Sequence, residues 1–153
     1  MEQVLDMFRN PFLLVAMASW TVAQVIKTII YAVINGKLSW ERLFGDGGMP
    51  SGHSATVSSL STLTGLVYGF SSFEFAATAV LAIIVCHDAM GVRLETGKQA
   101  QLINEIQKAV EFLTKKDLPE VKLKEFVGHT PMQVLVGITI GVCNAILFYA
   151  LFF

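Results

Sequence analysis

The sequence has few charged residues, few prolines, two cysteines and no marked excess of charge of either sign. Charged residues make up 15% of the 153 residues, below the roughly 25% usual in soluble domains. A formal net charge of −1 argues against a nucleic-acid partner. Cys86 and Cys143 lie in apolar stretches, which indicates packing and neither a disulfide nor a metal site. The length is that of one domain, residues 1–153.

The chain is instead rich in long apolar segments. Hydrophobic residues make up 54%, and the mean hydropathy is +0.60. Four segments approach the about 20 apolar residues that cross a bilayer. They lie near residues 11–35, 51–69, 73–86 and 131–153. The sequence therefore predicts an all-α, integral membrane helical bundle of about four transmembrane helices, with the Ser/Thr/Gly-rich second segment at its centre.

Local signals mark some of the helix starts. Asn10 before Pro11, and Thr130 before Pro131, are each a capping residue followed by proline at the first helical position. The glycine pair Gly137 and Gly141 can bring two helix backbones close, within one bundle or in a homo-oligomer.

The segment between the third and fourth spans predicts an amphipathic helix at the cytoplasmic face. Apolar residues recur on one helical face. They are Leu102, Ile103, Ile106, Ala109, Val110 and Leu113. We expect this helix to pack on the bundle or lie in the membrane interface; a partner-binding role is the alternative.

The distribution of lysine and arginine predicts the orientation. Nine of the eleven such residues fall on the side that holds the loop before Pro50 and the segment after Asp88. The positive-inside rule places this side in the cytoplasm and both termini outside. We therefore expect an integral protein of a bacterial plasma membrane. The nine are Lys37, Arg42, Arg93, Lys98, Lys108, Lys115, Lys116, Lys122 and Lys124.

A glycine-rich stretch that runs from Gly47 through Pro50-Ser51-Gly52-His53 opens the second span. Glycines let a backbone approach an anion closely, and a helix start offers unpaired N–H groups and the positive end of the helix dipole. Ser51 can cap the helix or bind, and His53 can transfer a proton. The stretch predicts a phosphate cradle at the start of a membrane helix.

The topology brings further chemistry to the same face. All three histidines, His53, His87 and His129, fall at this level, together with Asp88 and Arg93. Lys27 lies about two turns inside the first span, on one stripe with Gln24 and Tyr31. An intramembrane cation is costly unless it is paired or faces a cavity. Lys27 therefore points into an anion pocket or, alternatively, snorkels to the interface.

Three blocks in this order resemble a known family. They are Gly47–Ala55, Asp88–Arg93 with Gly97, Ala100 and Asn104, and Gly128–Pro131 with Gly137 and Gly141. Together they are similar to the divergent branch of the type 2 phosphatidic acid phosphatase superfamily, which is related to vanadium haloperoxidases. The resemblance covers roughly residues 20–141.

The resemblance implies phosphoester hydrolysis through a phosphohistidine, without a cofactor or metal. It implies His129 as nucleophile and His53 as the general acid that protonates the leaving alcohol. The implied phosphate-binding residues are Lys27, Arg42, Ser51, Gly52 and Arg93. Membrane lipids surround such a protein, and a phosphorylated lipid is the expected substrate.

The chain also departs from the parent pattern. Gln133 stands where an aspartate is expected four positions after the nucleophile, and Asp88 or Glu125 are the candidates to replace that carboxylate. Two alternatives stay open. One is a non-catalytic membrane protein that binds or moves an anionic lipid. The other is a metal-dependent phosphatase centred on Asp88, with His87, His129, Asp46 and Glu95 nearby.

The orientation is testable by cysteine labelling in intact cells. Cysteines placed near residues 40 and 118 should be shielded from an impermeant thiol reagent, and one near residue 3 should be labelled, because the cation-rich face stays in the cytoplasm. Labelling near residue 118 from outside would contradict the cytoplasmic assignment.

Overall fold

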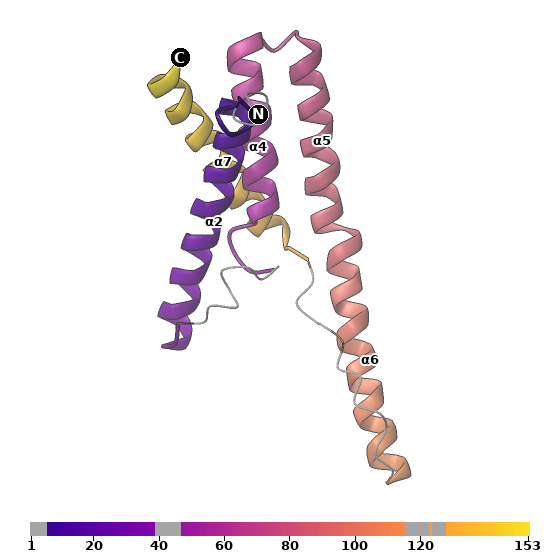
Figure 1. Ribbon diagram of the computed structural model, residues 1–153. Helices are drawn as coiled ribbons and strands as arrows, with labels where there is room; N and C mark the ends of the chain where they lie inside the picture. Colours follow the sequence, from indigo (N-terminus) through magenta and orange to yellow (C-terminus); the bar gives the residue numbers. More distant parts are fainter. Residues whose placement is uncertain (1–5, 39–46, 116–122, 124–127) are drawn as a thin grey trace.

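The computed structural model describes residues 6–38, 47–115, 123 and 128–153. The main helices, with their bounds, are α2 Pro11–Asn35, α4 Gly52–Tyr68, α5 Phe73–Met90, α6 Val92–Thr114 and α7 Pro131–Phe152. In Figure 1, α2, α4, α5 and α7 run alternately down and up, so the starts of α4 and α7 lie at the same end of the bundle as the end of α5.

The predicted capping signals define two helix starts. The Asn10 side chain accepts hydrogen bonds from the N–H groups of Phe12 (2.9 Å) and Leu13 (3.3 Å), and Pro11 begins α2. Thr130 and Gln133 form a reciprocal capping box at the start of α7. The first and last predicted spans are thereby confirmed.

Helix α4 lies at the centre of the bundle and packs against α2, α5 and α7. Its inward side chains are mostly small hydroxyl groups, and several donate to carbonyls of their own helix or of a neighbour. Ser58 Oγ donates to the Ile138 carbonyl of α7 at 3.3 Å, and Ser59 Oγ reaches the Val15 carbonyl of α2 at 3.5 Å. These bonds satisfy polar groups where no water is available. The predicted central position is therefore correct.

Among the described residues, three helical stretches are long and apolar enough to cross a membrane, one fewer than the four spans predicted from the sequence. They are Pro11–Asn35, Pro131–Phe152 and Phe73–Thr114. Helix α4, with 17 residues, is shorter. Because protein surrounds α4 on several sides, it needs less apolar surface than a helix that faces lipid.

Contact between α4 and α7 depends on glycine. A Cβ atom at Gly141 would collide with the Ser58 hydroxyl and the Ala55 carbonyl of α4, and one at Gly137 would meet the Ser51 carbonyl. The pair therefore packs two helices of one bundle, the first of the two roles predicted for it.

The predicted end of the third span, at residue 86, is wrong. Helix α5 continues to Met90, so His87 and Asp88 lie in its last turn and not after it. Helix α6 begins directly beyond Gly91 and continues α5 away from the bundle (Figure 1). The prediction that its apolar face packs on the bundle is wrong: Leu102 and Ile106 are 57% and 52% exposed.

Replacing Gly141 by valine tests the α4–α7 contact. The added side chain has no space beside Ser58, so Gly141→Val should lower the midpoint of thermal unfolding in detergent, with an overpacking cost of about 1–3 kcal/mol. Ala150→Val, at an exposed position of the same helix, is the matched control. Equal midpoints for the two variants would show that the close approach does not matter for stability.

Candidate functional site

The glycine-rich stretch forms a tight turn before α4. Gly47 and Gly48 have φ values of 80° and 82°, a left-handed conformation that residues with a side chain seldom adopt. Ser51 is fully buried and caps α4, since its Oγ accepts hydrogen bonds from the Ser54 N–H (3.3 Å) and the Ser54 hydroxyl (2.9 Å). Its own N–H donates to the Gln133 carbonyl at 3.0 Å. Of the two roles predicted for Ser51, the structure places it in the capping role.

Lys27 lies beneath this turn. The side chain is 5% exposed, and its Cγ and Cδ atoms are 3.7 Å from the position that a Cβ would take at Gly48. Holding a lysine inside a membrane helix costs about 2.5–3.5 kcal/mol near the bilayer centre. The Lys27 stem is therefore buried against the turn and does not extend along the helix surface.

Gln24, one turn before Lys27, also reaches the start of α4. Its Cδ lies 3.9 Å from the Cβ position of Gly52, and the side chain is 5% exposed. Among the described residues its Oε1 has no hydrogen-bond partner. No role is predicted for Gln24 from the sequence, although a glutamine three residues before a lysine in an apolar span is the signal that indicates a shared polar site.

His53 and His129 face each other. Their ring centroids are 6.3 Å apart, with the ring planes at 80°. His53 is half-buried in the first turn of α4, whereas His129 is 3% exposed just before α7. The backbone N–H of His129 donates to the Ala89 carbonyl at 3.0 Å, which connects His129 to the end of α5. The structure thus brings together two imidazoles from distant parts of the chain.

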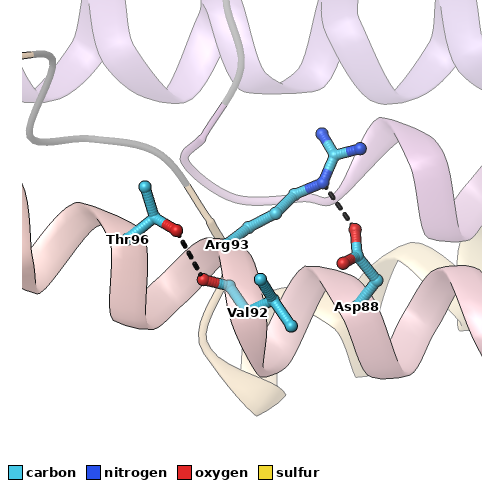
Figure 2. A network of polar contacts seen from close by, with 4 residues as sticks. All are labelled: Asp88, Val92, Arg93 and Thr96. Carbon is cyan, nitrogen blue, oxygen red and sulfur yellow. Dashed lines mark hydrogen bonds and ion pairs between the residues drawn. The ribbon is translucent and has the colours of Figure 1, made fainter.

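Asp88 and Arg93 form an ion pair across the junction of α5 and α6. Arg93 Nε donates to Asp88 Oδ2 at 2.7 Å (Figure 2). The two terminal nitrogens of the guanidinium point away from Asp88 in the same view. The Arg93 backbone also adjoins Gly128, where a Cβ would lie 2.6 Å from the Arg93 carbonyl carbon. Residues far apart in sequence, Arg93 and His129, therefore belong to adjoining segments.

The side chains of Gln133 and His87 do not join this cluster. Gln133 Oε1 accepts from the Thr130 N–H at 3.0 Å, so its amide caps α7. His87 is exposed at the end of α5. Arg42, Asp46 and Glu125 lie outside the described residues. Within the described part of the chain, no three His, Cys, Asp or Glu side chains are grouped so that they could hold a metal ion.

The sequence of the chain is similar to known proteins. A family model described as the Divergent PAP2 family matches residues 8–144. The chain is 38% identical to the uncharacterized membrane protein YuiD of Bacillus subtilis (strain 168), over 90% of this chain and 93% of that protein. No solved structure matches the chain.

Proposed function

The chain belongs to the Divergent PAP2 family, and from this premise we propose that it is a membrane phosphatase that hydrolyses a phosphomonoester or pyrophosphate, in particular of a lipid. The observation that carries the proposal is the facing pair His53 and His129 at the start of α4 and α7. Two imidazoles at this separation suit one attacking and one protonating group on either side of a single phosphorus atom.

Cationic groups around the pair would bind the phosphate. Lys27 approaches from beneath the cradle, and the terminal nitrogens of Arg93 can each donate to a phosphate oxygen. The N–H groups in the first turn of α4 add donors at the positive end of the helix dipole. Arg42 would contribute if the loop before the cradle brings it to the same phosphate. Ser51 and Gly52 support this binding by shaping the turn.

The reaction would proceed in two steps. A ring nitrogen of His129 attacks phosphorus, the bond to the leaving oxygen breaks, and His53 donates a proton to that oxygen. Water then attacks the phosphohistidine, passes a proton to His53, and releases inorganic phosphate with His129 restored. Asp88 acts in this scheme by holding Arg93, through the 2.7 Å contact. No metal or cofactor takes part.

The position of the site in the bundle supports a lipid substrate and a cytoplasmic active face. The cluster lies at the end of the bundle to which nine of the eleven cations were assigned, so the active face would be cytoplasmic and both termini would lie outside. Lys27 lies within a membrane-spanning helix, which favours a phosphate that is anchored in the bilayer over one that is free in water.

One observation favours a second function, the binding or movement of an anionic lipid without catalysis. Gln133 stands at the position of the parent superfamily's aspartate and has no carboxylate to stabilise a cationic imidazole, and its amide oxygen accepts from the Thr130 N–H. A protein of this kind would bind phosphate through the same cradle and show no turnover.

The role of His53 can be tested with two leaving groups. His53→Ala should slow hydrolysis of an alkyl phosphate by about 10²–10⁴-fold, the usual contribution of general acid catalysis, and should slow an aryl phosphate much less. A phenolate leaves without help from a proton donor, whereas an alkoxide does not. Equal losses for both substrates in steady-state assays would make His53 a binding or structural residue.

His129 can be tested by trapping the intermediate. Wild-type protein incubated with a labelled phosphomonoester and denatured in alkaline detergent should carry an acid-labile, alkali-stable phosphate on His129. His129→Ala should lose both the label and turnover while it still binds inorganic phosphate, because a binding pocket needs no nucleophile.

His87→Ala is the matched control for that experiment, since His87 is exposed and outside the facing pair. The phosphohistidine mechanism predicts normal turnover in this variant. Loss of activity in His87→Ala, together with a strict magnesium requirement that chelation abolishes, would instead support the metal site around Asp88. Binding of inorganic phosphate without turnover in the wild-type protein would support the lipid-binding function.

A further inference from the structure

Helices α5 and α6 form one rod that is too long for a bilayer. The stretch Phe73–Thr114 has 42 residues, so at 1.5 Å per residue it is roughly 63 Å long, about twice the 30 Å hydrocarbon thickness. Figure 1 shows α5 packed along the bundle and α6 continuing beyond it. Counted from Phe73, the hydrocarbon layer ends after about 20 residues, near Arg93. Most of α6 therefore projects into water.

This projecting half carries an apolar seam with heptad spacing. Ile103 and Val110 occupy one core position of the repeat, and Ile106 and Leu113 occupy the other, with alternating steps of three and four residues. Their exposed fractions are 50%, 37%, 52% and 78%. They lie roughly 15–30 Å past the hydrocarbon edge, beyond the headgroup layer of about 5–8 Å. Lipid therefore does not cover them.

The returning chain contacts a different side of α6. Asn104 Nδ2 donates to the Leu123 carbonyl at 2.9 Å, and the Leu123 N–H donates to Asn104 Oδ1 at 3.0 Å. On a helical wheel, Asn104 lies about 140° from the middle of the seam, at 100° per residue. The seam thus faces away from the point where Leu123 is held.

We propose that this seam, defined by Ile103, Ile106, Val110 and Leu113, joins two copies of this chain in a parallel coiled coil on the cytoplasmic side. Two copies inserted in the same bilayer have the same orientation, so a two-fold axis along the membrane normal makes their α6 helices parallel. In the second heptad, β-branched Val110 at one core position with Leu113 at the other favours a dimer, whereas Ile103 with Ile106 in the first heptad does not select for two strands.

The flanks of the seam are compatible with self-pairing. In a parallel homodimer, the residues that flank the core of one helix lie next to those that flank the core of the other. Charges of one sign at these positions would repel. The flanking residues are all uncharged: Ala100, Leu102, Gln107, Ala109 and Thr114. Glu105, Lys108 and Glu111 fall on the outer face. Two heptads are marginal for association in solution, but confinement in one membrane raises the effective concentration of the second helix.

Disulfide trapping in native membranes tests the proposal on the full chain. In a background with Cys86→Ser and Cys143→Ser, single cysteines at Ile106 and Val110 should yield a dimer under mild oxidation. Cysteines at the outer positions Glu105 and Lys108 should yield several-fold less. Because each cysteine must meet its own counterpart, cross-linking at both core positions also requires a parallel, in-register pair.

A mass measurement completes the test without relying on disulfide geometry. In native membrane discs extracted with a polymer, which keep the chains in one bilayer, the wild-type protein should be a dimer, Ile106→Lys should be a monomer, and Lys108→Ala should remain a dimer. A monomeric wild-type protein, equal cross-linking at core and outer positions, or a cross-link to a polypeptide of another mass would overturn the proposal. A stable dimer in Ile106→Lys would place the contact elsewhere and overturn it as well.

Discussion

The close approach of α4 and α7 determines where the candidate site lies. Glycines at 137 and 141 allow α7 to lie against the Ser/Thr-rich face of α4, with Ser58 donating across the contact. The Ser51 N–H to Gln133 carbonyl bond then joins the first turns of the two helices. Because both histidines lie at these helix starts, His53 and His129 face each other as a direct result of backbone packing.

Polar groups are placed in this bundle at a cost that packing and hydrogen bonds must offset. The hydroxyl groups of α4 donate hydrogen bonds to carbonyls within the bundle, which offsets the loss of hydration. The cation of Lys27 and the amide of Gln24 are instead buried beside the glycine-rich turn. The proposed phosphatase and the lipid-binding alternative both use this buried cation to bind an anionic phosphate.

The junction at Gly91 separates two physical environments along one rod. Helix α5 has the composition of a lipid-exposed span, whereas α6 is amphipathic and extends from the bundle. Asp88 and Arg93 form their ion pair at this junction, beside the segment that carries His129. A dimer formed through α6 would thus be continuous with the elements that support the site, although it would contribute no residue to it.

The sequence alone determined the membrane class, the starts of α2, α4 and α7, and the family resemblance, because caps, prolines and apolar runs act locally. The Thr130 and Gln133 capping box was also readable from the spacing of threonine and glutamine, and it explains why Gln133 is not available to His129. The facing of His53 and His129, the ion pair of Asp88 with Arg93 and the burial of Gln24 beside Gly52 were decided only by tertiary structure. They depend on how closely helices approach and in which direction α6 leaves α5, and neither is encoded in the pattern of any single segment.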